Sequence, residues 1–389
     1  MTRSPAEAAP PHIAPTHAPA PRRAPDELAA HLPEGKTRLW RPKRIVIAKA
    51  AAGTAVAAQA ARVGAELGAE VVHLSGNTVR GLKGESEAET YRRAKSTLAI
   101  VQAPPSALKL QPIPPSADFR LDLAVGCPAH CQYCYLAGSL SGPPVTRAYA
   151  NLGEIFAVLP DYLGQGRITS GTQARGHEGT TFEASCYTDP LGIEHLTGSL
   201  SAAIEHVAGM HQEGAEIGLR FTTKYDAVAP LLTLQHGGRT RARFSVNAEI
   251  VTRLFEGGTA PLGARLAAMG RMAAAGYPVG LTVAPIMPVE GWQDAYDALL
   301  SRTAAVLPEG ADLTVELITH RFTPGSREVL MGWYPATKLE MDPGVRAQKR
   351  NKFGGVKYVY PKALMDEMKG WFGEAVRARL PRASVLYWT

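Results

Sequence analysis

Three of the four cysteines of this chain, Cys127, Cys131 and Cys134, lie within one short stretch in the spacing C-x3-C-x2-C. A run of strand-forming residues, 121–125, and then Gly126 come directly before them. Cysteine thiolates at such a spacing ligate either zinc or an iron–sulfur cluster. The chain must therefore adopt a fold that presents a metal-binding loop at the end of a strand.

The ligand set favours a cluster over zinc. A zinc site would want a fourth ligand, for which His130 is a candidate, but zinc sites usually use two separated cysteine pairs and there is no second C-x2-C. Three cysteines on a [4Fe-4S] cluster leave one iron open to bind S-adenosylmethionine (SAM). Electron transfer then cleaves SAM and releases a 5′-deoxyadenosyl radical. Tyr133, beside the third cysteine, fits this radical SAM pattern.

Composition sets broad limits on the class of protein. A hydrophobic content of 45% and a charged content of 20% are typical of a soluble globular chain. The formal net charge of +7 permits a nucleic-acid partner without requiring one. Four cysteines, three of them clustered, favour a reducing, cytoplasmic location. No apolar run approaches the ~20 residues that span a bilayer, so we expect no membrane association.

The chain divides into four segments. Residues 1–38 are rich in Pro and Ala and are expected to form a disordered extension. Residues 39–115 predict a small α/β unit, with strands at 44–47 and 70–74 and helices at 51–67 and 87–101, followed by a proline-rich linker. Residues 116–325 predict the main domain, and residues 326–389 a C-terminal hairpin and helix.

The main domain alternates strand and helix. Six predicted strands joined by helical crossovers indicate a parallel α/β sheet, in the form of a partial (β/α)6 TIM-like barrel. Functional groups in such folds gather at the carboxyl ends of the strands. The cysteine loop, Cys186, Lys224, Asn247 and His320 all fall there, so we expect the site at that rim. The predicted strands are 121–125, 180–186, 217–224, 241–248, 279–286 and 313–320, and helices are predicted at 198–212, 261–275 and 292–306.

Several motifs, in order, resemble the spore photoproduct lyase family of radical SAM enzymes. The resemblance covers roughly residue 75 to the C-terminus and is specific to this family among radical SAM enzymes. Its motifs are Tyr91-Arg-Arg-Ala-Lys-Ser-Thr-Leu98, the cysteine loop 126–136, Phe182-Glu-Ala-Ser-Cys186 with Asp189, Gly192-Ile-Glu-His-Leu196, Leu219-Arg-Phe-Thr-Thr-Lys224, Arg243-Phe-Ser-Val-Asn247, Gly276-Tyr-Pro278, Ala284-Pro-Ile286 and Leu317-Ile-Thr-His-Arg-Phe322.

The resemblance implies a carbon–carbon lyase that repairs a methylene-bridged thymine dimer, spore photoproduct, in DNA. The adenosyl radical would take a hydrogen from C6 of the lesion, the bridge would fragment, and a thiol would return hydrogen. A [4Fe-4S] cluster and SAM are the implied cofactors, and flavodoxin or ferredoxin the implied reductant of a monomeric enzyme. Two alternatives stay open: a radical SAM enzyme with another nucleic-acid or small substrate, and a zinc-stabilised DNA-binding protein.

The resemblance also implies roles for residues at the rim. Cys186 matches the hydrogen-donating thiol, although a free cysteine is often only a small buried hydrophobe. Tyr133 and Tyr135 match the tyrosines that relay the radical back toward SAM; the structural alternative is aromatic cover over the cluster. Thr188, Asp189, Lys224 and Ser245 match SAM-binding positions, although a lysine at a strand end can also simply extend toward solvent. Asn247, Glu183 and His320 are equally well explained as core polar groups.

The predicted hairpin at 352–360, with Gly354 and Gly355 at its turn, is the expected DNA wedge. Lys352-Phe353 stands where the family has Arg-Tyr; Phe can stack, but Lys lacks the bidentate geometry of a guanidinium. Lys357 and Arg350 would add phosphate contacts, unless the basic run is only a solvated surface. Tyr187, directly after Cys186, departs from the smaller residue common in the family and leaves room for a divergent substrate.

Overall fold

The computed structural model describes residue 37 and residues 39–138, 142–350 and 354–389. Its largest sheet has the strand order β17-β14-β13-β11-β10-β9-β5-β4, parallel throughout except for the β4–β5 pair at one edge. This is the predicted partial barrel. Its strands are β4 (Pro112–Ile113), β5 (Ala117–Leu121), β9 (Thr180–Ala184), β10 (Ile217–Thr223), β11 (Thr240–Val246), β13 (Val279–Ile286), β14 (Leu313–Thr319) and β17 (Ser384–Trp388).

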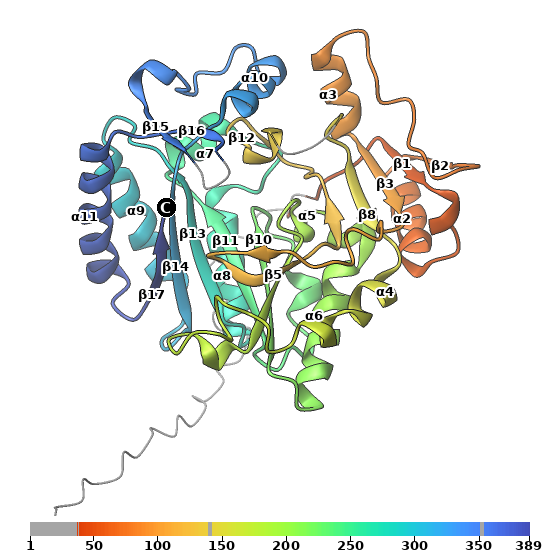
Figure 1. The fold of residues 1–389 in the computed structure, drawn as a ribbon, viewed down its shortest axis with the longest axis horizontal. Coiled ribbons are helices and arrows are strands. Elements are labelled where there is room, and N and C mark those ends of the chain that lie inside the picture. The colour runs from red at the N-terminus through yellow and green to blue at the C-terminus, as the bar shows by residue number, and fades with distance from the viewer. Residues whose placement is uncertain (1–36, 38, 139–141, 351–353) are drawn as a thin grey trace, which may run out of the picture.

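The strands of this sheet send apolar side chains to one face and polar side chains to the other, because successive residues of a strand alternate in direction. In β11, Ala242, Phe244 and Val246 are fully buried hydrophobics, whereas Arg243 and Ser245 lie between them in sequence. Helices cover the sheet in Figure 1, with α9 and α11 along one flank. They are α5 (Pro190–Thr197), α6 (Ser199–Gln212), α7 (Glu249–Phe255), α8 (Leu262–Ala274), α9 (Trp292–Val306), α10 (Pro324–Trp333) and α11 (Lys362–Arg379).

A second sheet stands beside the barrel, on the other side of the molecule from α11 (Figure 1). Its order is β2-β1-β3-β8-β6, parallel except for β6–β8. Two of its strands come from beyond residue 115, so the N-terminal α/β unit is completed by the segment around the cysteine loop. The sheet consists of β1 (Arg44–Ile47), β2 (Glu70–His73), β3 (Thr97–Val101), β6 (Ala124–Val125) and β8 (Thr146–Tyr149), with α2 (Ala55–Glu66), α3 (Glu87–Lys95) and α4 (Leu152–Ala157) nearby.

Two of the predicted elements run across a boundary between two elements of the structure. The strand expected at 121–125 is β5, which ends at Leu121, followed by β6 in the other sheet. The helix expected at 87–101 ends at Lys95, and Thr97–Val101 forms β3. In both places only one or two residues separate neighbouring elements, so the sequence pattern alone does not mark the boundary. The predicted disordered extension lies outside the described residues, apart from Thr37.

The C-terminal region closes the barrel edge. β15 (Ala347–Arg350) and β16 (Val356–Val359) form the hairpin, which begins five residues earlier than predicted. Helix α11 then leads to β17, the predicted edge strand, which pairs with β14. Lys352 and Phe353 lie outside the described residues. The hairpin is attached to the barrel by reciprocal backbone hydrogen bonds between Tyr358 and Phe322. Within the described ranges, no helix combines the length and apolarity that a membrane span requires.

Candidate active site

The cysteine loop is held by its backbone. Its strand β7 (His130–Cys131) pairs with β12 (Glu256–Gly257), so that Cys131 lies opposite Glu256. The Lys95 ammonium donates hydrogen bonds to the carbonyl oxygens of Cys127 and Ala129. These bonds fix the turn without using a sulfur atom. All four cysteines are free of disulfides.

The thiols of the loop suit a cluster better than one metal ion. Burial raises the pKa of the Cys131 thiol well above its ordinary value, so a bound metal is needed to hold it as a thiolate. Among the described residues, no three His, Cys, Asp or Glu side chains gather closely enough to hold a single ion. A four-iron cluster takes each cysteine on a different iron and therefore fits three more widely spaced thiols.

His130 is part of an aromatic cluster. Its Nδ1 lies 3.0 Å from the hydroxyl of Tyr91, which also hydrogen-bonds the hydroxyl of Tyr334. The Tyr91 ring packs on Trp333 with centroids 4.8 Å apart. His130 therefore joins the loop to α3 and to the end of α10, and one of its ring nitrogens is occupied by this role.

A buried ion triad lies beneath Tyr133. The Lys224 ammonium is 3.1 Å from Glu256 Oε1 and 3.0 Å from both the Tyr133 hydroxyl and Ser245 Oγ. Arg265, fully buried, reaches the other Glu256 oxygen at 2.5 Å. Burial by itself would raise the pKa of Glu256, but Lys224 and Arg265 outweigh it and lower this pKa to about 2. Glu256 is thus a carboxylate that holds both cations in place.

The predicted SAM-binding residues surround this triad. Asp189 caps α5, accepting from the Gly192 amide at 3.1 Å, and also accepts from the Lys224 amide at 2.6 Å and the Thr223 hydroxyl at 2.8 Å. Burial is the main reason that the pKa of Asp189 is raised to about 6. The hydroxyl of Thr188 is buried and has no hydrogen-bond partner in the described residues, so it can bond a ligand there.

Cys186 lies at the end of β9, next to a strained residue. Ser185 has φ +56°, the single non-glycine residue with positive φ in the described ranges, and is buried. Its Oγ accepts hydrogen bonds from the amides of Leu123 (2.9 Å) and Ala124 (3.1 Å). The Tyr135 hydroxyl donates to the Cys186 carbonyl at 3.0 Å. Cys186 is therefore fixed from two sides, by β5–β6 and by the cysteine loop.

The surroundings of Cys186 keep its sulfur protonated. Burial is the largest cause that raises the pKa of the Cys186 thiol, and the carboxylates of Asp122 and Glu183 add to it against Arg120 and Arg243. A neutral thiol is the form that can give up a hydrogen atom. Tyr187 turns toward Arg120, whose guanidinium lies 4.8 Å from the ring centroid.

The other predicted polar residues have structural partners. Asn247 is fully buried, donates to the Pro285 carbonyl and accepts from Tyr296. His320 is buried against Arg346, and burial together with that cation lowers its pKa to about 3. Glu183 is an ion-pair partner of Arg243, which also bonds Glu316 at 2.8 and 2.9 Å. These groups form the polar interior of the barrel.

The described hairpin residues carry positive charge. Arg350 is exposed at the end of β15, and Lys357 is opposite Lys349 in the β15–β16 register. Partial burial, then repulsion by Arg321 and Lys349, lowers the pKa of Lys357. The two cations nevertheless present positive charge on one short ribbon, as a phosphate-binding surface requires.

Sequence reasoning missed the residues that hold the site together. Glu256 and Arg265 belong to none of the recognised motifs. Lys95 and Tyr91 lie within a recognised motif, but the sequence analysis gives that motif no role. The charge of Lys95 and the hydroxyl of Tyr91 are the features by which they could have been identified. The partner of Lys224 could not be inferred, because Glu256 is more than thirty residues away in sequence and is brought to Lys224 by tertiary structure.

Comparison with known proteins extends over nearly the whole described chain. A family model described as spore photoproduct lyase matches residues 40–389. The spore photoproduct lyase of Geobacillus sp. (strain Y412MC61) is 42% identical over 318 residues, which cover 81% of this chain and 89% of that protein. The spore photoproduct lyase of Bacillus subtilis (strain 168) is 40% identical over 317 residues, covering 81% and 88%.

Solved structures agree with the fold. A mutant spore photoproduct lyase with bound AdoMet and dinucleoside spore photoproduct superposes with a TM-score of 0.80 at 37% identity, covering 90% of this chain and 99% of that one. A spore photoproduct lyase complexed with dinucleoside spore photoproduct gives a TM-score of 0.80 at 38% identity, with the same coverage.

Proposed function

The chain belongs to the spore photoproduct lyase family, and from that premise we propose that it repairs spore photoproduct in DNA as a radical SAM lyase. One observation within the fold carries the proposal. The three-cysteine loop and Cys186, separated by more than fifty residues, meet through the Tyr135 hydroxyl on the Cys186 carbonyl. This contact supports the proposal that a radical-generating loop and a hydrogen-donating thiol share one rim of the barrel.

The cofactors of this enzyme are a [4Fe-4S] cluster and SAM. Cys127, Cys131 and Cys134 would hold the cluster, and Thr188, Asp189, Lys224 and Ser245 would contact SAM. When bound, the two cofactors supply a 5′-deoxyadenosyl radical. Lys224 contributes a positive charge held by Glu256, and the unpartnered Thr188 hydroxyl supplies a hydrogen-bonding group.

Cys186 is proposed to finish the repair. After the C6 hydrogen has been taken from the lesion and the methylene bridge has broken, one thymine carries an unpaired electron on its methyl carbon. The Cys186 thiol gives that carbon a hydrogen atom and becomes a thiyl radical. Tyr135 is proposed to return a hydrogen atom to the sulfur and to regain one from Tyr133, whose own hydrogen would be replaced from 5′-deoxyadenosine. The Tyr135–Cys186 contact supports the first of these transfers.

The hairpin is proposed to hold the damaged duplex. The family relationship, and the solved relatives that contain a dinucleoside lesion, support a thymine dimer as the bound group. Arg350 and Lys357 would contact phosphates, and Lys352-Phe353 would fill the gap that the extruded lesion leaves in the stack. The expectation of a different substrate is not favoured by the relatives.

The proposal is tested by product analysis. Protein with a cluster reconstituted under anaerobic conditions is given SAM, a reductant and dinucleoside spore photoproduct, and thymidine dinucleotide is measured by chromatography. We expect repaired dinucleotide to accumulate over many turnovers. SAM cleavage without any repaired dinucleotide would refute the lyase assignment.

A further inference from the structure

Gln132, the first of the two residues between Cys131 and Cys134, is half-buried and bonded to two neighbouring elements. The backbone N–H of Gln132 donates a hydrogen bond of 2.9 Å to the Phe255 carbonyl, and its side-chain Nε2 donates one of 3.2 Å to the Leu254 carbonyl. Its Oε1 accepts from the Thr337 hydroxyl at 2.5 Å. Gln132 is therefore clamped between the end of α7 and the segment that follows α10, while its neighbours Cys131 and Tyr133 are buried.

The surface around Gln132 combines one apolar residue with two cations. The Leu254 side chain is 42% exposed, and Arg253 and Lys338 are exposed on the two elements that clamp Gln132. Within the described ranges, the side chains of Arg253 and Lys338 form no hydrogen bond or ion pair. An exposed leucine between uncommitted cations, directly over a ligating loop, has no evident structural role.

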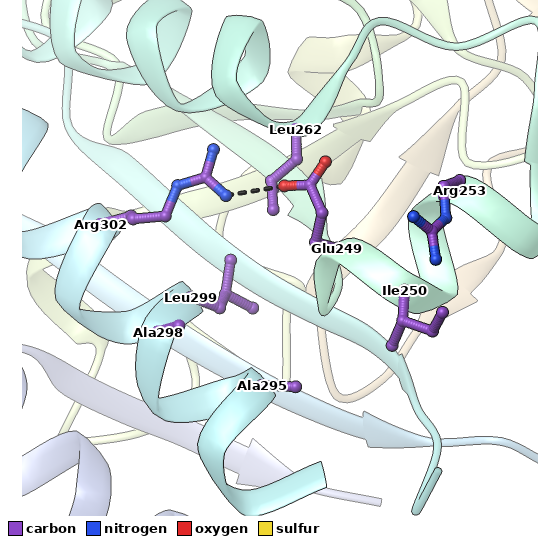
Figure 2. A pocket seen from close by; sticks show the side chains of 8 residues that line it. All are labelled: Glu249, Ile250, Arg253, Leu262, Ala295, Ala298, Leu299 and Arg302. Atoms are coloured by element: carbon purple, nitrogen blue, oxygen red, sulfur yellow. Dashed lines mark hydrogen bonds and ion pairs between the residues drawn. The ribbon is translucent and has the colours of Figure 1, made fainter. Parts of the chain in front are cut away.

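A groove continues this surface along α7. Figure 2 shows Arg253 and Ile250 on α7, facing α9 across an opening of about 300 Å³. Its floor is apolar, and Glu249 and Arg302 close the far side with an ion pair of 2.7 Å. The apolar lining consists of Ile250, Leu262, Ala295, Ala298 and Leu299.

We propose that Arg253, Leu254 and Lys338, with the adjoining α7–α9 groove, form the docking surface for the enzyme's electron donor, an acidic one-electron carrier protein. The inference rests on the proposed function, because reductive cleavage of SAM needs one electron from outside the chain for each radical. Among the described residues, Gln132 links this surface directly to Cys131. A carrier seated here would approach the cluster through the loop itself.

The chemistry of the surface selects the partner. Two cations without partners, on a chain of net charge +7, attract an acidic protein and orient it before contact. Electron-transfer encounters are small and weak, so one exposed leucine and a shallow apolar groove are enough for the contact area. A flavodoxin, which is acidic and carries one electron at a time, has these properties.

The test compares two reductants. The rate of cluster reduction is measured in a stopped-flow spectrometer as the loss of visible absorbance. The protein donor is reduced bacterial flavodoxin, and the small neutral donor is photoreduced deazariboflavin. Arg253→Glu combined with Lys338→Glu reverses the charge of the surface. Arg62→Glu combined with Lys49→Glu, at two exposed cations on α2 and shortly after β1, is the control, because it reverses the same number of charges elsewhere on the surface.

We expect the double variant to be reduced by flavodoxin at least tenfold more slowly than the native protein, and to lose its steep dependence on salt. Reduction by deazariboflavin, and the SAM cleavage that follows, should be unchanged. Flavodoxin rates equal to those of the Arg62→Glu and Lys49→Glu control would overturn the proposal, as would equal slowing with both donors. No SAM cleavage by native protein with deazariboflavin would instead refute the proposed function, and the docking surface with it.

Discussion

The Tyr135 hydroxyl donates a hydrogen bond of 3.0 Å to the backbone carbonyl of Cys186. Tyr135 directly follows the third cysteine of the loop, and Cys186 directly follows the strained Ser185 at the end of β9. The contact therefore connects the proposed radical-generating loop to the proposed hydrogen donor. It also leaves the Cys186 sulfur free for the substrate, because the phenol bonds the backbone and not the thiol.

Replacing Cys186 by alanine should separate SAM cleavage from repair. The cluster loop is untouched, so SAM is still cleaved, but the product radical has no thiol to quench it and yields side products. Chromatography with mass detection should find the repaired dinucleotide largely replaced by adducts. Clean repair by Cys186→Ala would contradict the assigned role.

Tyr135→Phe should raise the amount of SAM consumed per repair. Without the phenol the thiyl radical on Cys186 is not returned efficiently, so each turnover needs a new radical. The ratio of 5′-deoxyadenosine to repaired dinucleotide should rise several-fold while cluster absorbance stays the same. Tyr162→Phe, which alters a hydroxyl bonded to the Leu110 amide, is the control and should leave that ratio unchanged.

Glu256→Gln should destabilise the protein by about 3 kcal/mol or more, because it leaves Lys224 and Arg265 buried with no counter-charge. Glu249→Gln, in an exposed pair with Arg302, should cost under about 1 kcal/mol. Urea unfolding of both variants at pH 7 measures the difference. Equal losses of stability in the two variants would contradict a stabilising role for the buried triad.

The contribution of Glu256 should also depend on pH. The pKa of Glu256 is lowered from 4.5 to about 2 in the folded protein, so its stabilisation is complete above pH 4.5 and declines as the pH falls toward 2. The stability gap between native protein and Glu256→Gln, from urea unfolding at successive pH values, should therefore narrow below pH 4.5. A stability difference that increased below pH 4.5 would contradict the lowered pKa of Glu256.

Ser185 gives a test of strain. Alanine keeps the unfavourable positive φ and leaves the Leu123 and Ala124 amides without their acceptor, which should cost about 1–3 kcal/mol. Glycine loses the same hydrogen bonds but relieves the φ, which is worth about 1 kcal/mol. In chemical unfolding, Ser185→Gly should thus be more stable than Ser185→Ala, and the reverse order would argue against strain at this position.

Lys357→Ala and Arg350→Ala should each weaken binding of lesion-containing duplex. The salt slope of binding should fall by about 1 for each phosphate that the protein no longer neutralises. Repair of the dinucleotide, which lacks the flanking phosphates, should change little. Fluorescence anisotropy across a salt series measures the slope, with exposed Lys362→Ala on α11 as control. An unchanged slope in all three variants would place DNA elsewhere on the surface.

Much of the fold follows from local pattern. The alternation of β10 (Leu219, Arg220, Phe221, Thr222) predicts a strand with one apolar and one polar face, and periodic helices between such strands predict the barrel. The completion of the second sheet by β6 and β8 could not be predicted, because β6 is two residues long and pairs with β8 across the cysteine loop. Pairing at that length is decided by tertiary contacts.

The residues of the candidate site also include some that the sequence predicts and some that it does not. The loop cysteines and Cys186 are visible because their chemistry is rare in the sequence. Glu256 and Arg265 are not, because a buried ion pair is defined by its partner and the partner is brought in by folding. Lys224 illustrates the consequence: its position at a strand end is predictable, whereas its attachment to Glu256 is not.

The most direct test of the account is repair in deuterated water. Thiol hydrogens exchange with solvent, so the Cys186 thiol carries deuterium in this experiment. Native protein is given SAM, a reductant and dinucleoside spore photoproduct. Mass spectrometry should then find thymidine dinucleotide with one deuterium in a thymine methyl group. That result requires both the lyase reaction and an exchangeable donor at the rim. Repaired dinucleotide without deuterium would contradict Cys186 as donor, and SAM cleavage without dinucleotide would contradict the central claim itself.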